Sequence, residues 1–435
     1  MEANMSTTIL TSAWDAIILS FSPVFTQPTS QIFINLITGW ILCTCRRTIT
    51  GIMPFAEPKS KRPHDAYHRM FPKSHWQPSG LWKLLAQLLI GMFYPSGTVW
   101  MDMDDTIFHR TGRKVNGAGW WRDAIRSSAS HLVHCWGLNL VVLTLRVIPP
   151  WGGEPLGLPV NMRLHRKNSP GLVKLAEQML AEVKGWFPQR QFMTSADGFY
   201  ATLAGRGAAY THLISRMRRD AAIYELPGKK QKHQRGPNRK KGRRLPTPTQ
   251  IASRAKSWQR VKTCERGRTK YRLVHARVVI WYKVSHFPVL LVISRDPAGK
   301  EKDDFFFTTD LEFTPAEVIG GFAGRWSTED TFKNTKQSLG SEEPQTWKGQ
   351  GPERAAVISL WLYSVVWAWY IRYGYRNSSI PIMPWYAAKT HPSFQDALAT
   401  LRKVLWRKRI IVMFGNHTVP ARIIEFFINA VASAA

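Results

Sequence analysis

Residues 138–147 (LNLVVLTLRV) form a nearly uninterrupted aliphatic run, and this run limits the fold more than any other feature. A run without regular alternation of polar and apolar residues is typical of a strand buried on both faces, in the middle of a sheet. Shorter apolar segments predict further strands at 98–101, 191–194, 211–217, 271–282, 288–294 and 305–309.

Helical segments lie between these strands. Leucines recur at helical spacing over residues 80–93, and Ser169-Pro170 is a suitable start for a helix that runs to about residue 183. A further helix is expected at 199–206. The longest apolar run, 357–371, is shorter than a typical membrane span of about 20 residues, so we interpret it as a buried core helix.

Acidic residues follow two of the predicted strands. Asp102, Asp104 and Asp105 come after strand 98–101, and Asp197 comes after strand 191–194 and before Gly198. The carboxyl ends of strands are where open α/β sheets place their chemistry. Carboxylates held close together repel one another, so these acids indicate either a bound metal ion or a solvated turn. The residues alone leave both interpretations open.

A third acid lies on a predicted helix. Thr314-Pro315 is a suitable start and Gly340 a suitable end, so the whole segment is expected to be one helix. Its spacing then places five side chains in one stripe, namely Arg325, Glu329, Phe332, Lys333 and Lys336. Such a stripe is either a solvated ladder of ion pairs or a metal-binding carboxylate among phosphate-binding cations.

The charge of the chain indicates a polyanionic partner. Its 435 residues include 60 Lys and Arg but only 29 Asp and Glu, which gives a formal net charge of +31. Nucleic acid is the expected partner, and we expect no membrane partner, which would favour a long amphipathic or spanning helix. Residues 229–244 carry nine of these cations, so we expect a mobile, phosphate-contacting loop that includes Lys240, Lys241, Arg243 and Arg244.

The four cysteines, Cys43, Cys45, Cys135 and Cys264, are too few and too scattered for a disulfide framework. The Cys43–Cys45 pair has no second pair and no histidine at zinc-binding spacing. A reduced, cytosolic protein follows.

Taken together, the acidic group at 102–105, Asp197 and Glu329 have the chemistry of a site that binds divalent cations. Carboxylates of this kind can bridge two metal ions about 3.5–4 Å apart, which activate a nucleophile and stabilise the leaving oxygen of a phosphodiester. Hard oxygen ligands favour Mg²⁺, with Mn²⁺ as a substitute, over zinc. A glycosidase with a carboxylate pair is the remaining alternative, but it leaves the polycation unexplained.

In these elements the sequence resembles the DDE transposases of bacterial cut-and-paste insertion sequences. Their signature Y-x2-R-x3-E-x6-K is matched by Arg325, Glu329 and Lys336, with Phe322 at the tyrosine position. Asp104-Asp105-Thr106 is similar to the family's D-x-T element, with Asp104 as the first acid and Asp105 as the alternative. Residues 196–200 (ADGFY) are similar to its A-D-x-x-Y element, with Asp197 as the second acid.

The resemblance, which covers roughly residues 64–370, implies a ribonuclease H-like α/β fold. A mixed sheet would be flanked by helices and would bring Asp104 and Asp197 together on adjacent strands. It also implies five regions: an N-terminal helical region that helps to recognise DNA ends (1–97), the first part of the core (98–218), a basic β-rich insertion (219–311), the final part of the core with the catalytic helix (312–376) and a basic helical C-terminal region (377–435).

The implied function is metal-dependent cleavage of DNA at the ends of a mobile element and strand transfer into a target. Arg325, Lys333 and Lys336 would contact phosphates, and the protein would act on double-stranded DNA as a dimer, in the bacterial cytoplasm at the nucleoid. The alternative is a catalytically inactive DNA-binding protein derived from such a transposase, although the presence of all three acids favours an enzyme.

Overall fold

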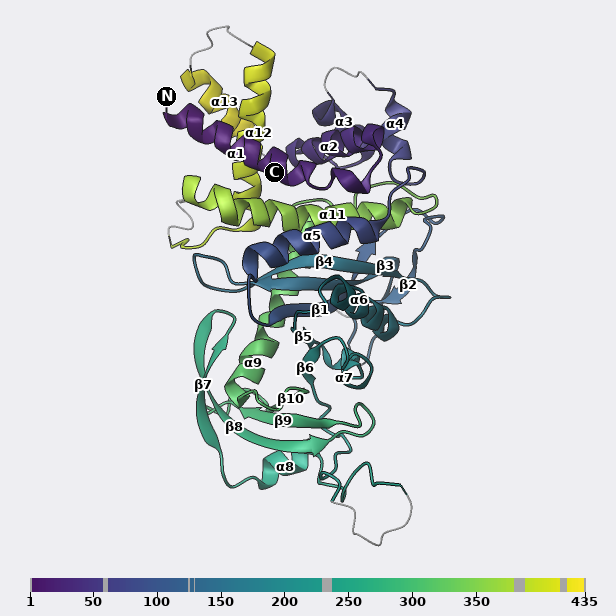
Figure 1. Cartoon of the computed structure of the whole chain (residues 1–435), viewed down its shortest axis with the longest axis vertical. Coiled ribbons are helices and arrows are strands. Elements are labelled where there is room, and N and C mark those ends of the chain that lie inside the picture. Colours follow the sequence, from purple (N-terminus) through teal and green to yellow (C-terminus); the bar gives the residue numbers. More distant parts are fainter. Residues whose placement is uncertain are drawn as a thin grey trace.

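The computed structural model describes residues 2–57, 62–123, 126–128, 130–228, 237–378, 388–414 and 421–433 (Figure 1). One mixed sheet runs through this part of the chain, in the order β2-β3-β1-β5-β6-β10-β9-β8-β7, and β4 pairs with β3 beside that path. Its strands are β1 (Val99–His109), β2 (Gly119–Arg122), β3 (His134–Val147), β4 (Leu156–His165), β5 (Phe192–Ala196), β6 (His212–Arg216), β7 (Gln259–Glu265), β8 (Arg268–Ile280), β9 (Pro288–Arg295) and β10 (Asp304–Thr308).

Five strands form the half of the sheet that carries the acids. β4, β3 and β1 are antiparallel neighbours, and β5 and β6 follow β1 in parallel. Three antiparallel strands joined to two parallel ones are the arrangement of a ribonuclease H-like core, so the predicted fold class is confirmed. The run at 138–147 lies in β3, and nearly all of that strand is buried.

The basic, β-rich segment continues the same sheet. β10 pairs antiparallel with β6, and β9, β8 and β7 follow in antiparallel order. The strands predicted at 271–282, 288–294 and 305–309 are therefore confirmed as β8, β9 and β10. The five predicted regions with their boundaries remain a prediction.

Helices cover the sheet. In Figure 1, α5 and α11 lie between the sheet and the helices of both chain ends. The helices are α1 (Glu2–Leu19), α2 (Gln27–Leu42), α3 (Ile49–Ala56), α4 (His64–Arg69), α5 (Pro78–Phe93), α6 (Leu172–Trp186), α7 (Leu203–Arg206), α8 (Pro248–Arg254), α9 (Pro315–Ala323), α10 (Ser327–Gln337), α11 (Gly351–Trp369), α12 (Phe394–Phe414) and α13 (Ala421–Ser433).

Helix α11 is the predicted core helix. Together with the turns that follow it, it is long and apolar enough to span a membrane, but 94% of its most apolar window is buried inside the protein. Every residue from Gly351 to Trp369 except Glu353 is buried, and its aromatic side chains pack against Phe21, Phe33 and Phe394. The helix therefore forms the centre of the core.

Several predicted boundaries were wrong. The strand expected at 98–101 runs to His109, because β1 pairs with β3 along its whole length, so Asp102, Asp104 and Asp105 lie within the strand. Helix α6 begins at Leu172 with Gly171 as its N-cap, because the Ser169 hydroxyl instead closes a turn by accepting from the Arg166 amide. Residues 199–206 form a 3₁₀ turn (η2, Gly198–Tyr200) and the short helix α7.

The expected helix between Thr314 and Gly340 is also broken. It consists of α9, a 3₁₀ turn (η3, Gly324–Trp326) and α10. The carbonyl of Gly321 accepts hydrogen bonds from Arg146 Nη2 (2.7 Å) and Ser195 Oγ (3.0 Å), which compete with its place in the helical ladder. A side chain at Gly324 would also lie 2.6 Å from the Arg146 guanidinium. The break therefore accommodates a buried arginine.

That arginine forms an ion pair in the core with Asp102, the one acid of the β1 group that is fully buried. Arg146 of β3 donates to both Asp102 oxygens, through Nε at 3.0 Å and through Nη2. Nη2 also donates to Ser195 Oγ of β5 at 3.1 Å. The pair thus connects β1, β3 and β5 with α9, and it is a structural element that the sequence analysis missed.

Candidate active site

Asp104 and Asp197 lie side by side because β1 and β5 are parallel neighbours. Their last register pair is Met103 with Ala196, and the two acids are the next residues on each strand. Asp197 ends β5 with an extended backbone, and its carbonyl accepts from Ser215 Oγ at 3.0 Å and from the Tyr200 amide at 2.9 Å. The predicted juxtaposition of these two residues is therefore present in the fold.

The negatively charged form of Asp104 lies in an unfavourable environment, because the side chain is buried beside other carboxylates. One of its oxygens pairs with Arg325 Nη1, and the other accepts from the Asp105 amide at 3.0 Å. The pKa of Asp104 is raised to about 7, because burial and the neighbouring Asp105 and Asp197 carboxylates together outweigh the lowering effect of Arg325. A cation bound next to the Asp104 carboxylate would stabilise its charged form.

Asp105 points to the opposite face of the strand from Asp104, as alternation along a strand requires. Its Oδ1 accepts from the Tyr200 hydroxyl at 2.9 Å. Burial raises the pKa of Asp105, as does Asp197, while the Tyr200 hydrogen bond lowers it. Tyr200 holds this carboxylate in place, whereas Asp104 faces Arg325 and, through it, Glu329.

Glu329 reaches the site from the first turn of α10. Its carboxylate is 43% exposed and lies 3.8 Å from Arg325 Nη2, so one guanidinium lies between Asp104 and Glu329. Partial burial raises the pKa of Glu329, and Arg325 and Arg266 lower it. Arg325 belongs to η3 and its side chain is only 9% exposed, so the first residue of the predicted stripe is buried while it still pairs with Glu329 one turn later.

The donor chemistry of these three carboxylates suits a divalent metal ion. Each offers hard oxygen ligands, and Asp104 and Glu329 already converge on a cationic group, the Arg325 guanidinium. Among the described residues, the Asp197 carboxylate has no hydrogen bond or ion pair and is therefore available as a ligand. The donor set suits Mg²⁺ or Mn²⁺ better than a softer metal.

The predicted phosphate-binding residues occupy different environments. Lys333 is exposed one turn after Glu329. Lys336 is largely buried, 3.8 Å from Glu342 and stacked over Phe108. Arg325 is buried against two carboxylates, with its guanidinium 5.5 Å from the ring of Phe322, the residue at the signature's tyrosine position.

In the part of the chain that the structure describes, the cations of the basic loop form no ion pair with the three acids. The first half of the loop, 229–236, lies outside the described residues. In the second half, Lys241 is stacked over the rings of Tyr224 (4.1 Å) and Tyr282 (4.5 Å), and residues 242–245 pair with residues 223–225. The expectation of a mobile polycation is therefore wrong for this half, because aromatic stacking and backbone hydrogen bonds fix it. Lys240, Arg243 and Arg244 are exposed here.

Two tryptophans of the β-rich segment, a residue type that can stack on DNA bases, have other contacts. Trp281 is 4% exposed and packs edge-on against Phe307, so it belongs to the core. Trp258 is half-buried and lies under the Arg295 guanidinium at 4.1 Å.

A second basic surface borders the end of β1. A cavity of about 580 Å³ is lined there by segments 109–115 and 342–347, together with Arg46. Arg110, Arg113 and Lys114 contribute positive charge to its wall.

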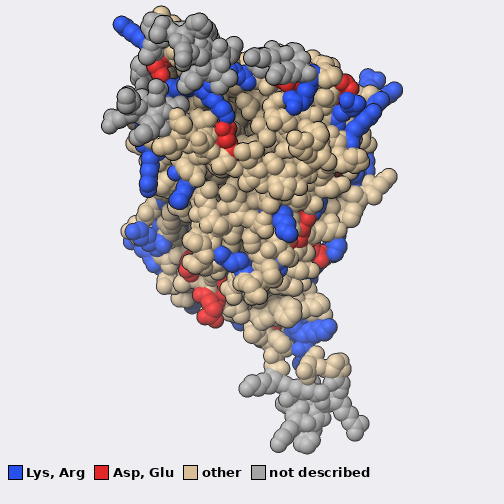
Figure 2. All heavy atoms as spheres, turned by 45° about the horizontal axis from the view of Figure 1, so that its top comes forward, with Lys and Arg blue, Asp and Glu red and all other residues tan. Residues whose placement is uncertain are grey.

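On the face of the molecule shown in Figure 2, Lys and Arg side chains lie around a broad centre of uncharged residues.

Arg266 is a candidate functional residue that the sequence analysis missed. It occupies, with Gly267, the tight turn between β7 and β8, and both residues have positive φ angles of 51° and 69°. Its guanidinium lies 3.5 Å from the centre of the Trp326 ring, on the turn that precedes α10. The turn fits closely against the loop after β3, where a Cβ on Gly267 would be 2.5 Å from Gly153. The β7–β8 hairpin thus brings a cation to Glu329.

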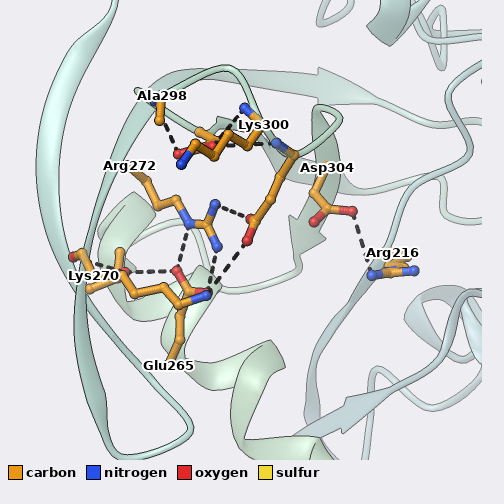
Figure 3. Close-up of polar contacts among 10 residues, drawn as sticks. Arg216, Glu265, Lys270, Arg272, Ala298, Lys300 and Asp304 are labelled. Atoms are coloured by element: carbon orange, nitrogen blue, oxygen red, sulfur yellow. Dashed lines mark hydrogen bonds and ion pairs between the residues drawn. The ribbon is translucent and has the colours of Figure 1, made fainter.

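Ion pairs hold this hairpin rigid. Arg272 of β8 donates to both oxygens of Glu265 at 2.7 Å and also pairs with Glu301 in the loop after β9 (Figure 3). Lys270 is 3.6 Å from Glu265 and 3.8 Å from Glu301. Two features of the sequence could have revealed the hairpin. Arg266-Gly267 is suited to a tight turn, and Glu265 and Arg272 have opposite charges on the two strands that the turn joins.

Comparison with known proteins places the chain in a family context. The profile of a family described as "DDE superfamily endonuclease" matches residues 20–286, more than half of the chain. This match includes Asp104 and Asp197 and ends before Glu329. Among solved structures, the cryo-EM structure of the piggyBac transposase synaptic complex with hairpin DNA is 8% identical, with a TM-score of 0.42, and the alignment covers 92% of this chain and 76% of that one. No curated protein gives a significant match.

Proposed function

The chain belongs to the DDE superfamily of endonucleases, and on that premise we propose that it is a DNA transposase. It cuts DNA strands at the ends of a mobile element and joins the freed 3′-hydroxyl groups to a target. The observations that support this proposal are that Asp104 and Asp197 follow paired residues of β1 and β5, and that Arg325 lies between Asp104 and Glu329. The bacterial insertion-sequence origin, the signature branch and the nucleoid location remain predictions.

In this proposal Asp104, Asp197 and Glu329 hold Mg²⁺ or Mn²⁺, with Asp104 as the first acid. Asp104 is favoured over Asp105 because it shares a guanidinium with Glu329, whereas Asp105 is engaged by Tyr200. Such ions, when bound, activate the attacking hydroxyl and stabilise negative charge on the phosphodiester.

The residues of the chain position the DNA. Lys333 and Arg266 are exposed on either side of Glu329 and are suited to bind phosphates of the strand being cut. Lys240, Arg243 and Arg244 offer further phosphate contacts on the β-rich half of the sheet. The net charge of +31 supports association with double-stranded DNA, on which we expect the protein to act as a dimer.

The proposal is tested by cleavage of a plasmid that carries the DNA flanking this protein's own gene. We expect cuts at defined positions with Mg²⁺ or Mn²⁺ and no cuts with EDTA. Cleavage that persists in EDTA would contradict the metal-dependent mechanism. Binding without cleavage in either metal would favour the alternative, an inactive transposase-derived DNA-binding protein.

Arg266→Ala tests the contribution of the β7–β8 hairpin. The variant should bind DNA more weakly regardless of sequence, and the slope of log affinity against log salt concentration should fall by about 1, because one phosphate contact is lost. Binding is measured by fluorescence anisotropy at several salt concentrations. The matched control is Arg260→Ala, which removes an arginine stacked over Tyr271 in the same hairpin, six residues before the turn. If both substitutions weakened DNA binding equally, Arg266 would contribute no more to DNA binding than another arginine of the hairpin.

A further inference from the structure

A second group of potential metal ligands lies at the far end of β1. His109 is the last residue of that strand, Asp123 follows β2 directly, and Cys135 is the second residue of β3. One ligand atom from each of the three residues lies within 4.8 Å of the others. The register of the sheet explains this meeting, since His109 pairs with Gly137 and Trp121 pairs with Cys135.

The contacts of His109 fix which of its ring nitrogens is available. Nδ1 lies 2.9 Å from Glu342 Oε1, which also accepts from the His109 backbone amide at 2.8 Å. A carboxylate only accepts hydrogen bonds, so in the neutral imidazole Nδ1 carries the proton and Nε2 carries a lone pair. Nε2 is buried and has no hydrogen-bond partner among the described residues. An imidazole that donates one N–H to a carboxylate and keeps the other nitrogen free has the arrangement of a metal-ligating histidine.

The other two ligands are buried and held in place. Cys135 is 8% exposed and Asp123 is 7% exposed. The Asp123 backbone amide donates to the Val133 carbonyl at 2.8 Å, and one of its carboxylate oxygens accepts from the Arg126 amide at 3.1 Å. A carboxylate that follows β2 and a thiol on β3 are thus presented together beside the end of β1.

We propose that His109, Asp123 and Cys135 bind a zinc ion, at a site separate from the catalytic acids. An imidazole nitrogen, a thiolate and a carboxylate are the ligand types that zinc takes in proteins, whereas Mg²⁺ prefers an all-oxygen set. Water can supply the fourth ligand. Asp104 precedes His109 by five residues along an extended strand, which is roughly 16 Å at 3.3 Å per residue.

The local charge tolerates a dication. Asp123, Glu342 and a Cys135 thiolate together contribute three negative charges, and Lys336 lies 3.8 Å from Glu342. Arg126, 3.5 Å from Asp123, adds a second positive charge from a largely exposed side chain. These five groups carry a net charge of −1 in this state, and a bound zinc ion would change the net charge to +1.

Zinc at this position would fasten the ends of β1, β2 and β3 to one another. Through Glu342 it would also hold the segment that follows α10, the helix that carries Glu329. His109 and Glu342 both line the basic cavity at the end of β1, so the ion would stabilise the wall of that cavity as well.

Cobalt provides a probe that separates this site from the catalytic one, because only a thiolate ligand gives an intense near-ultraviolet charge-transfer band. We expect the full-length protein, titrated with Co²⁺, to develop this band with one equivalent of metal and to lose it when Zn²⁺ is added. The absence of a band in the wild-type protein would overturn the proposal without reference to any variant. The carboxylates of the proposed catalytic site cannot produce the band, so Glu329→Gln should leave it unchanged.

Cysteine variants show which sulfur atom produces the charge-transfer band. A chain in which Cys135 is the only cysteine (Cys43→Ala, Cys45→Ser, Cys264→Ser) should retain it, and Cys135→Ser should lose it. Loss of the band in the first variant would assign the metal to one of the other cysteines, such as the Cys43–Cys45 pair, whose sulfur atoms are 3.5 Å apart, and would overturn the proposal. Glu342→Gln should keep the band but weaken zinc affinity by about 10-fold to 100-fold, as removal of such a supporting carboxylate does elsewhere.

Discussion

Glu329→Gln will lower the rate of DNA strand cleavage by roughly 10³-fold or more, equivalent to at least about 4 kcal/mol of transition-state stabilisation, and will leave DNA affinity nearly unchanged. The substitution keeps the size of the side chain and removes the charge with which it would hold a metal ion. The side chain is 43% exposed, and its one ion pair, with Arg325, has a separation of 3.8 Å, so little folding energy depends on it.

The matched control for this prediction is Asp330→Asn, which removes the neighbouring acid on the same turn of α10. Asp330 is exposed, and it is not among the residues that converge on Arg325. Cleavage should therefore stay within a few-fold of wild type in this variant. Cleavage and binding are measured on the same DNA in the same buffer, with Mg²⁺ and with Mn²⁺. If both variants lost activity equally, or if Glu329→Gln lost DNA binding to the same extent as cleavage, Glu329 would not be a metal ligand.

The sequence predicted the parts of the fold that depend on local pattern. The aliphatic run at 138–147 identified β3, and the short apolar segments before Asp104 and Asp197 identified β1 and β5. The meeting of these two acids could be anticipated because acids at the ends of neighbouring strands share an edge of the sheet. Strands β2, β4 and β7 were missed, because β2 has only four residues, β4 contains a proline and β7 has many polar residues.

Features that depend on distant contacts could not be predicted. The helix after Thr314 is broken by hydrogen bonds to Gly321 from Arg146 and Ser195, residues more than a hundred positions earlier. The turn at Arg266 reaches Trp326 only because the hairpin folds back over α9. His109, Asp123 and Cys135 have no ligand spacing in the sequence, because three strand ends bring them together.

Arg146→Met will destabilise the protein by about 3–5 kcal/mol, the usual cost of removing one partner from a buried ion pair. Asp102 is 0% exposed, and without Arg146 its charge has only Ser327 Oγ, at 3.5 Å, as a side-chain hydrogen-bond partner among the described residues. The guanidinium also supplies donors to Ser195 and Gly321, which would lose them. Chemical denaturation with urea, followed by circular dichroism, measures the free energy of unfolding.

Two further variants decide whether the loss comes from the unpaired charge or from the altered volume. Arg146→Met combined with Asp102→Leu should recover much of the stability, because replacing a whole buried pair with apolar side chains is often neutral or better. Arg69→Met, which breaks the exposed pair with Asp65 on α4, should cost less than about 1 kcal/mol. If the double variant were as unstable as the sum of its single substitutions, the two residues would be uncoupled, and the break between α9 and α10 would require a cause other than the Asp102–Arg146 pair.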